Sequence, residues 1–393
     1  MITPRHEVWA VVLAAGDGLR LAELTTNVRG ECVPKQYCSL DGRDSLLDGA
    51  IVRARQVADG ERVAVIVAES HRRFWRDSLN RLPGGNVIVQ PANRGTANGV
   101  VLSVLSILRR DPQACIVFLP ADHHVRDEPK LALAMRGAIR TLATSARTLA
   151  LVGIEPDEPD PGLGYIVPGR NLPDGSRTVE EFVEKPELSR AHELIAAGAL
   201  WNSLIFSANG LALLEKARAS MGWIVDAMAA ALARDALVGG DPAALTELYR
   251  ALPCVDFSRT ILEGTVTSLR VVTAPRCGWC DLGTPTRVAG VLQRLQQEGP
   301  APRTNQSAPA NYRAVTRSSI PVLRPPTSGL AQESARERIV SRTSRFFVGR
   351  SLSDGRGDCK RSNADVGWRQ ARCRRGGHLC PGARRARCNH CCG

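Results

Sequence analysis

The sequence predicts an α/β fold of Rossmann-like type, in which a mixed, mostly parallel sheet carries helices on both faces. Short apolar runs typical of buried strands alternate with longer segments whose apolar residues recur at helical spacing. Polar or glycine-containing turns follow two of these runs, at 14–20 (AAGDGLR) and 120–124 (PADHH). Because ligands of open α/β sheets bind just beyond the carboxyl ends of strands, both turns mark candidate binding positions.

The elements of the first half follow from these two patterns. Strands are expected at 8–13, 63–67, 86–89 and 114–119. A helix is expected over 45–58, where Ser45 and Asp48 have the spacing of a capping box, and another over 70–81. Thr96 opens a further helix, which its hydroxyl can cap. The inner face of that helix would carry Val100, Val101, Val104, Leu105 and Leu108.

The second half has a more mixed pattern of strands, turns and alanine-rich helices. Strands are expected at 149–153, 164–167, 178–186, 202–208 and 266–272. Helices are expected near 189–197, within 208–251 and over 284–297. Beyond residue 298 the periodicity gives way to Pro, Ser, Arg and Gly, so we place a domain boundary there and predict one domain over 1–298.

The net charge of +13 belongs to the segment after this boundary. Residues 299–393 hold 19 Lys and Arg against 5 Asp and Glu, whereas residues 1–298 hold 33 against 34. We expect this basic Arg/Cys/Pro/Ser-rich tail to be disordered or frame-shifted. Its arginines could bind RNA and its last Cys and His residues zinc, but we rank these alternatives lower. A nucleic-acid partner is not expected of the body.

Cysteine usage and hydropathy bear on the compartment. No run approaches the roughly 20 apolar residues that a membrane-spanning helix needs. The first apolar run is too short for a signal peptide and passes into a turn, so we interpret it as a buried strand. The six body cysteines do not suggest a disulfide framework, and we take the C-x-x-C pair Cys277 and Cys280 as incidental. A cytoplasmic protein without membrane contact is expected.

Several short motifs carry chemistry. A glycine-containing turn after a strand, as in LAAGDGLRL (13–21), lets backbone N–H groups approach phosphates. Asp122 ends a strand in FLPADHHVRD (118–127), where a carboxylate suits Mg²⁺ bound to phosphates. One of the two following histidines would shape the site. The other motifs are PKQ (34–36), QPANRGTANG (90–99), GLGYIV (162–167), VEEFVEKP (179–186), LWNSLIFSA (200–208) and CGWCDLGTP (277–285).

Each motif alone is explained as well by structure: a tight turn, a capped helix, a hairpin glycine, an exposed Glu-Lys pair or a core Trp. In this order over some 270 residues, however, they resemble the sugar-1-phosphate nucleotidyltransferase family. QPANRGTANG is similar to the E-N-R-G-T-A segment of its mannose-1-phosphate guanylyltransferases, with Ala92 in place of the acidic residue.

The resemblance implies the nucleotidyltransferase fold and a reaction of GTP with mannose-1-phosphate that gives GDP-mannose and pyrophosphate, by Mg²⁺-assisted in-line attack on the α-phosphorus. It implies roles for the following residues. Catalytic residues would be Arg20, Lys35 and Asp122; nucleotide-binding residues Leu13, Ala14, Ala15, Gly16, Gly18, Arg20, Lys35, Asn93, Gly95 and Thr96; sugar-phosphate-binding residues Gly164, Tyr165, Glu184, Lys185 and Asn202; and metal ligands Asp122 and Asp281.

Three positions depart from the family pattern. Leu19 replaces the Thr before the loop Arg, Ala15 replaces the second Gly of L-A-G-G, and Leu204 replaces the Gly of W-N-S-G. Two alternatives therefore stay open: a related enzyme that uses UTP or dTTP, and a catalytically weak paralogue that binds sugar nucleotides. The sequence also leaves a homo-oligomer open.

Overall fold

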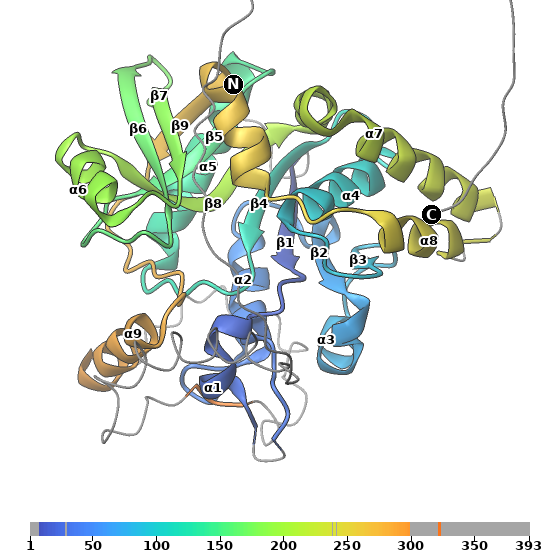
Figure 1. Cartoon of the computed structure of the whole chain (residues 1–393), viewed down its shortest axis with the longest axis horizontal. Coiled ribbons are helices and arrows are strands. Elements are labelled where there is room, and N and C mark those ends of the chain that lie inside the picture. The colour runs from blue at the N-terminus through green and yellow to red at the C-terminus, as the bar shows by residue number, and fades with distance from the viewer. Residues whose placement is uncertain (1–7, 28–29, 238, 241, 299–320, 324–393) are drawn as a thin grey trace, which may run out of the picture. The chain divides into compact units, whose positions relative to one another are not determined.

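The computed structural model describes residues 8–27, 30–237, 239–240, 242–298 and 321–323 of the 393-residue chain. They build one nine-stranded sheet with helices packed against it (Figure 1), and the sheet order is β3-β2-β1-β4-β8-β5-β9-β7-β6, with β8 also pairing to β6. The strands are β1 (Val8–Ala14), β2 (Val63–Ala68), β3 (Val87–Gln90), β4 (Cys115–Pro120), β5 (Leu149–Ile154), β6 (Gly164–Asn171), β7 (Arg177–Glu184), β8 (Leu200–Asn209) and β9 (Leu269–Thr273).

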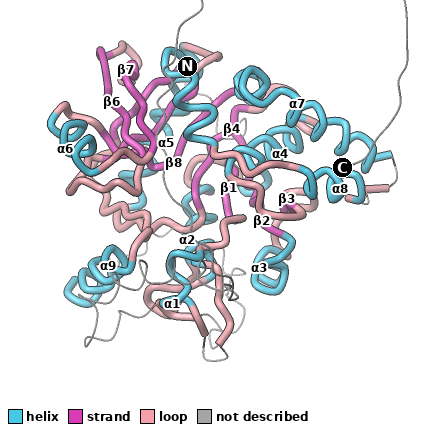
Figure 2. The backbone as a smooth tube through the Cα atoms, viewed as in Figure 1, coloured by secondary structure: helices cyan, strands magenta, loops and turns pink. Residues whose placement is uncertain are grey.

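Helices cover both faces of this sheet, as the tube view in Figure 2 shows. They are α1 (Ala22–Thr25), α2 (Leu46–Ala54), α3 (Arg72–Leu79), α4 (Thr96–Leu108), α5 (Glu128–Thr144), α6 (Leu188–Ala196), α7 (Gly210–Leu237), α8 (Ala243–Ala251) and α9 (Pro285–Glu298). The predicted capping box is confirmed, because the Ser45 hydroxyl accepts from Asp48 N while the Asp48 carboxylate accepts from Ser45 N. The sequence reasoning missed α5, although its apolar residues recur at helical spacing.

The sheet has two unlike halves. Strands β3, β2, β1 and β4 are all parallel. Alternate residues of β1 enter different cores: Ala10 and Val12 one, Trp9 and Val11 the other. Strand β8 then runs antiparallel to both β4 and β5, and β6 and β7 are antiparallel neighbours. The predicted α/β class with a mixed sheet and helices on both faces is confirmed.

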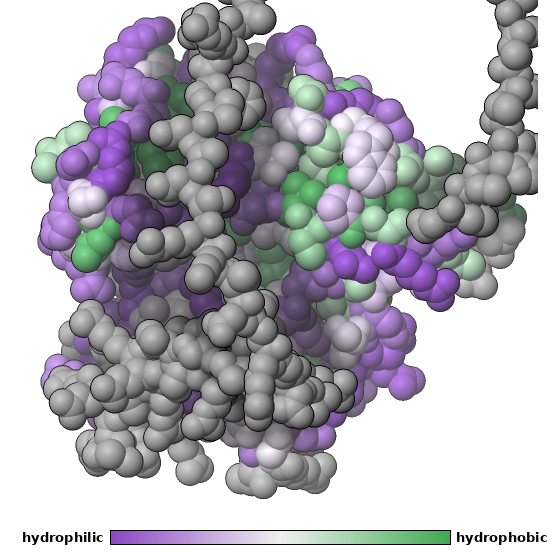
Figure 3. Space-filling view, in the orientation of Figure 1, coloured by the Kyte–Doolittle hydropathy of each residue, from purple (hydrophilic) through white to green (hydrophobic). Residues whose placement is uncertain are grey.

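Two surface features complete the fold. Among the described residues, no helix is long and apolar enough to cross a membrane. Figure 3 shows apolar colour gathered over α7 and α8, and α7 leaves the Trp223 side chain exposed.

Of the predicted tail, the structure describes only Pro321–Leu323. Ser39 N donates to Pro321 O at 2.9 Å, Leu323 N donates to Ser39 O at 2.8 Å, and Leu323 is buried in the hydrophobic core that also includes residues of α2. The expected disorder or frame shift of the remaining tail lies outside the described residues. The boundary after residue 298 stays a prediction.

Candidate active site

The glycine-containing loop after β1 is held by its own backbone geometry and by Gln36. Gly18 has a φ of 64°, and a Cβ there would lie only 2.9 Å from Lys35 N, so a larger residue is excluded. Gln36 Nε2 donates to Ala14 O at 2.9 Å and to Gly16 O at 2.8 Å. The motif PKQ contains Gln36 but predicts no role for it; a buried amide can satisfy two loop carbonyls at once.

Arg20 lies in the single 3₁₀ turn Leu19–Leu21 that follows this loop, and its side chain is exposed. A Cβ on Gly162 would lie 3.9 Å from Arg20 Nη1, so the loop between β5 and β6 approaches the glycine loop here. Within the described part of the chain, no hydrogen bond or ion pair holds Arg20. Its guanidinium is therefore available to a phosphate.

Lys35 is the centre of the site. It is 5% exposed, and its Nζ lies 2.9 Å from Asp122 Oδ2 and donates to Asp281 O at 2.6 Å and Leu282 O at 3.3 Å. A bridge between His124 and the segment at 280 aligns these chain segments, with both N–H···O distances at 2.9 Å. Three predicted residues from distant parts of the sequence are thus brought together.

The electrostatics of this centre favour the ionised form of Asp122. Burial opposes the charge on Asp122, but the ammonium group of Lys35 outweighs it and the pKa of the carboxyl group is lowered. Burial lowers the pKa of His123 to about 4, against the opposing effect of Asp122. Trp279 Nε1 donates to His123 Nδ1 at 3.2 Å, which fits a neutral imidazole.

The residues present fit Mg²⁺ through Asp122 more directly than through Asp281. The Asp122 side chain is 36% exposed, whereas that of Asp281 is 12% exposed and its Oδ1 accepts from Arg287 Nη1 at 2.9 Å. No group of three His, Cys, Asp or Glu side chains suited to a metal occurs among the described residues. Because Mg²⁺ usually takes one or two protein carboxylates and completes its shell with phosphates and water, Asp122 is a suitable ligand.

The turn after β3 joins three strand ends. Asn93 Nδ2 donates to Asp17 Oδ2 at 2.9 Å, and His71 Nε2 lies 3.2 Å from Asp17 Oδ1. Asn93 Oδ1 also accepts from Gly95 N at 3.1 Å. The predicted nucleotide residue Asn93 is therefore linked to the glycine loop after β1 and to the residues after β2, in the position that suits a nucleotide site.

The predicted cap by Thr96 is wrong. Gly95 is the N-cap of α4, Thr96 is its first helical residue, and no side chain caps this end. Gly95 has a φ of 83°, and a Cβ there would lie 2.7 Å from Val255 N, so only glycine fits between the turn and the Val255 backbone. That backbone fills the place where a side chain would project; the predicted contact of Gly95 with a base or ribose stays a prediction.

The predicted sugar side forms a second cluster. Gly164 pairs with Glu184 across β6 and β7, and a Cβ on Gly164 would lie 2.5 Å from Glu184 Oε2 and 3.3 Å from Asn202 Cβ. Asn202 Nδ2 donates to Ser258 Oγ at 3.2 Å. Burial raises the pKa of Glu184, although the hydrogen bond from Lys185, at 2.5 Å, opposes the shift. Three predicted residues again converge.

Tyr165, another of the predicted sugar residues, is fully buried. Its hydroxyl accepts from Asp160 N at 2.8 Å and donates to Asp160 O at 3.2 Å. The structure therefore uses this hydroxyl to hold the loop before β6. Its predicted contact with the sugar phosphate stays a prediction.

The backbone is strained at three motif positions. Among non-glycine residues, Lys185, Leu204 and Leu282 have φ values of 52°, 55° and 52°. Such values cost a non-glycine residue of order 1–3 kcal/mol and gather at functional sites. A positive φ at Leu204 explains why glycine suits this position of W-N-S-G, and nothing in the structure explains why Leu stands there instead.

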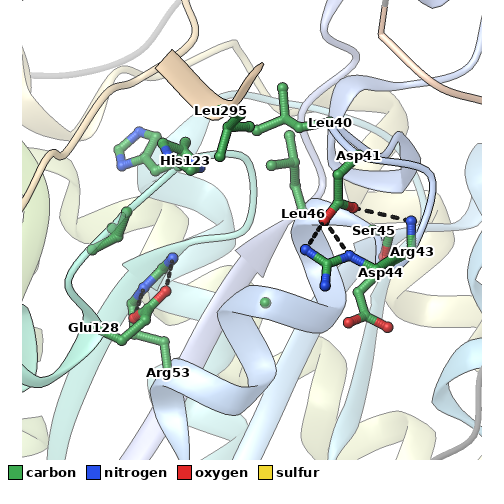
Figure 4. A pocket seen from close by; sticks show the side chains of 13 residues that line it. Leu40, Asp41, Arg43, Asp44, Ser45, Leu46, Arg53, His123, Glu128 and Leu295 are labelled. Carbon is green, nitrogen blue, oxygen red and sulfur yellow. Dashed lines mark hydrogen bonds and ion pairs between the residues drawn. The ribbon is translucent and has the colours of Figure 1, made fainter. Parts of the chain in front are cut away.

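A cavity of about 210 Å³ lies beside the site. None of the residues predicted to bind the nucleotide, the sugar phosphate or the metal lines it. Figure 4 shows His123, Arg53, Glu128 and the loop around Asp41 on its walls. Arg53 is buried and makes two hydrogen bonds to Glu128, at 2.9 and 2.8 Å. His123 lines this cavity and also adjoins Asp122 in the centre at Lys35.

Comparisons with known proteins agree with this geometry. Residues 9–298 match the family model described as nucleotidyl transferase. The chain is 31% identical over 298 residues to the xanthan biosynthesis protein XanB of Xanthomonas campestris, covering 73% of this chain and 60% of that protein. It is 32% identical over 298 residues to the mannose-1-phosphate guanylyltransferase ManC of Salmonella typhimurium, covering 72% and 59%.

Solved structures give the same result. A Thermus thermophilus protein described as mannose-1-phosphate geranyltransferase is 26% identical, with a TM-score of 0.60 over 70% of this chain and 76% of that one. The curated relatives are longer, and the match spans about 60% of their length. With its family model matched over most of its length, the chain belongs to the nucleotidyl transferase family.

Proposed function

We propose that this protein transfers GMP from GTP to mannose-1-phosphate and so makes GDP-mannose and pyrophosphate. The observation that carries the proposal is the Lys35–Asp122 ion pair, 2.9 Å long, beside a glycine loop whose carbonyls are held by Gln36. A buried cation, an accessible carboxylate and the backbone N–H groups of a glycine loop form a binding site for a metal-bound triphosphate. The relatives named as mannose-1-phosphate guanylyltransferases support the choice of substrates.

The reaction is a single in-line displacement. An oxygen of the sugar phosphate attacks the α-phosphorus of GTP, the bond between the α-phosphorus and its bridging oxygen to the β-phosphorus breaks, and pyrophosphate leaves with that oxygen. Catalysis is positioning and charge neutralisation. Arg20 binds the triphosphate, and Lys35 keeps Asp122 ionised and oriented. Asp122, and in the predicted set also Asp281, would hold Mg²⁺, which would supply charge neutralisation at the phosphates.

The sugar phosphate binds at the second cluster, which contains Gly164, Glu184 and Asn202. Lys185 is 44% exposed and can exchange its ion pair with Glu184 for a phosphate, which leaves Glu184 and Asn202 to contact the sugar hydroxyls. Because Leu204 N donates to Asn202 Oδ1 at 3.1 Å, residue 204 is the position where a different sugar would be selected. A UTP- or dTTP-dependent enzyme and a weak paralogue remain the alternatives. The cytoplasmic location and a homo-oligomer stay predictions.

The test is pyrophosphate release by the full chain with Mg²⁺. GTP, UTP, dTTP, ATP and CTP are each combined with mannose-1-phosphate and glucose-1-phosphate. Turnover with GTP and mannose-1-phosphate above every other pair is the expected result. Preference for another pair would keep the family and reject these substrates, and nucleotide binding without turnover would favour the paralogue.

A further inference from the structure

Arg287 forms an ion pair with Asp281, the carboxylate that the sequence predicts as the second ligand of the metal. Its Nη1 donates to Asp281 Oδ1 at 2.9 Å, and the two side chains are 9% and 12% exposed. Asp281 therefore already has a cation on it, just as Asp122 has Lys35. The resemblance assigned no role to Arg287.

Arg287 is held from three sides. Its Nη2 lies 3.0 Å from Asp160 Oδ2, an ion pair without the alignment of a hydrogen bond, and its guanidinium carbon lies 4.7 Å from the centre of the Trp201 ring. Asp160 is in turn fixed, because Gly162 N donates to Asp160 Oδ1 at 2.6 Å. The guanidinium thus connects the metal carboxylate to the loop between β5 and β6.

The position of this cation is unfavourable for its helix. Arg287 is in the first turn of α9, where the partial positive charge of a helix N-terminus disfavours another positive charge. Burial also opposes its ionisation, but Asp281 and Asp160 outweigh burial and raise the pKa of Arg287. The ion pairs with Asp281 and Asp160 therefore stabilise the guanidinium in a position that the helix and burial disfavour.

We propose that Arg287 is a positioning residue that competes with the divalent cation for Asp281. The proposal rests on the proposed function, since it concerns the same metal. In the free protein the guanidinium weakens cation binding at Asp281. Binding of the metal–nucleotide makes Asp281 exchange Arg287 for the metal, while Asp160 and Trp201 retain the guanidinium. Metal binding is thereby coupled to the loop that approaches Arg20.

Mn²⁺ binding to the full chain, counted by the electron paramagnetic resonance signal of the free ion, tests this directly, because Mn²⁺ accepts the same carboxylate ligands as Mg²⁺. Arg287→Met removes the competing charge and is expected to bind Mn²⁺ about tenfold more tightly than the wild type. Arg276→Gln is the matched control: Arg276 pairs with Glu155 of the same loop at 3.0 Å, does not contact Asp281, and its loss should leave the affinity unchanged.

The double variant Arg287→Met/Asp281→Asn should lose the gain, because the gain acts through Asp281. Unchanged or weaker Mn²⁺ binding in Arg287→Met, or a gain that persists in the double variant, overturns the proposal. If Arg287→Met does not fold, Arg287→Lys takes its place. Lysine cannot bridge Asp281 and Asp160 as a guanidinium does, so about threefold tighter binding is expected, and unchanged affinity again overturns the proposal.

Pyrophosphate release by the wild type separates this proposal from the proposed function. No release with GTP and mannose-1-phosphate, alongside tighter Mn²⁺ binding in Arg287→Met, rejects the function and leaves the role of Arg287 standing. Release by the wild type without tighter binding in the variant does the reverse.

Discussion

The two halves of the sheet hold their predicted ligand residues in different ways. In the parallel half, polar side chains are fixed mostly by the backbone: Gln36 binds two loop carbonyls and Lys35 binds two more. In the antiparallel half, charged side chains pair with one another, as Glu184 does with Lys185, and the backbone is strained at Leu204. Under the proposed function, the glycine loop of the parallel half is therefore held in place before the nucleotide binds, whereas Lys185 of the antiparallel half must leave Glu184 when the sugar phosphate binds.

The largest effect is expected in the parallel half, from Asp122→Asn. This change keeps the shape of the side chain but removes the charge that pairs with Lys35 and that we propose for the metal, so pyrophosphate release should fall by about 10³-fold, some 4 kcal/mol in activation free energy. Circular dichroism should show an intact fold. A rate within about threefold of the wild type would contradict the assignment of the centre.

A smaller loss is expected from Gln36→Ala, which breaks the backbone-held geometry without touching a charge. Two hydrogen bonds are lost at roughly 0.5–1.5 kcal/mol each, so kcat/KM for GTP should fall about 10- to 100-fold. The matched control is Gln296→Ala, on the exposed face of α9, which should leave kcat/KM unchanged. Equal kinetics in the two variants would mean that the loop is preformed without Gln36.

Acidification should lower the free energy of unfolding through His123, which lies in the parallel half. The folded protein keeps this imidazole neutral, with a pKa of about 4, whereas an unfolded chain binds a proton near the ordinary value of 6.5. Stability from this group is therefore present above pH 6.5 and is lost as the pH falls towards 4, by about 1–3 kcal/mol. His123→Gln should show a shallower loss in urea unfolding over this range. His192→Gln, an exposed control, should match the wild-type slope.

The smallest effect is expected in the antiparallel half, from Leu204→Gly. Relief of the positive φ offsets the lost packing of a partly buried side chain, so the free energy of unfolding should change by less than about 1 kcal/mol. The neighbouring Ile205 is buried and unstrained, and Ile205→Ala should lose about 2–5 kcal/mol. Equal losses in urea unfolding would show that Leu204 is not strained.

Sequence reasoning predicted more of the centre's membership than of its connections. Lys35, Asp122 and Asp281 were identified by motif and order, and the structure brings them together. The partners of these residues were not predicted: Arg287 lies in a helix whose sequence reports only periodicity, and its contact with Asp160 spans more than a hundred residues. The residue types of a motif indicate its chemistry, but an ion pair between residues far apart in the sequence has no local sequence pattern that predicts it.

Backbone conformation explains the other misses. Thr is a residue type that often caps helices. At the start of α4, however, Gly95 is the N-cap, with a positive φ, because the Val255 backbone lies against it. Leu204 departs from its motif without any sequence sign that its φ is positive. Capping by Ser45, in contrast, was predictable because both partners lie within one turn.

The most direct test of the central claim is product formation in one sample. The full chain is incubated with Mg²⁺, GTP and mannose-1-phosphate, and GDP-mannose and pyrophosphate are quantified together by chromatography. We predict that the two products appear in equal amounts and that neither forms when mannose-1-phosphate is omitted. Pyrophosphate release that does not need the sugar phosphate, or bound GTP without either product, would contradict the claim.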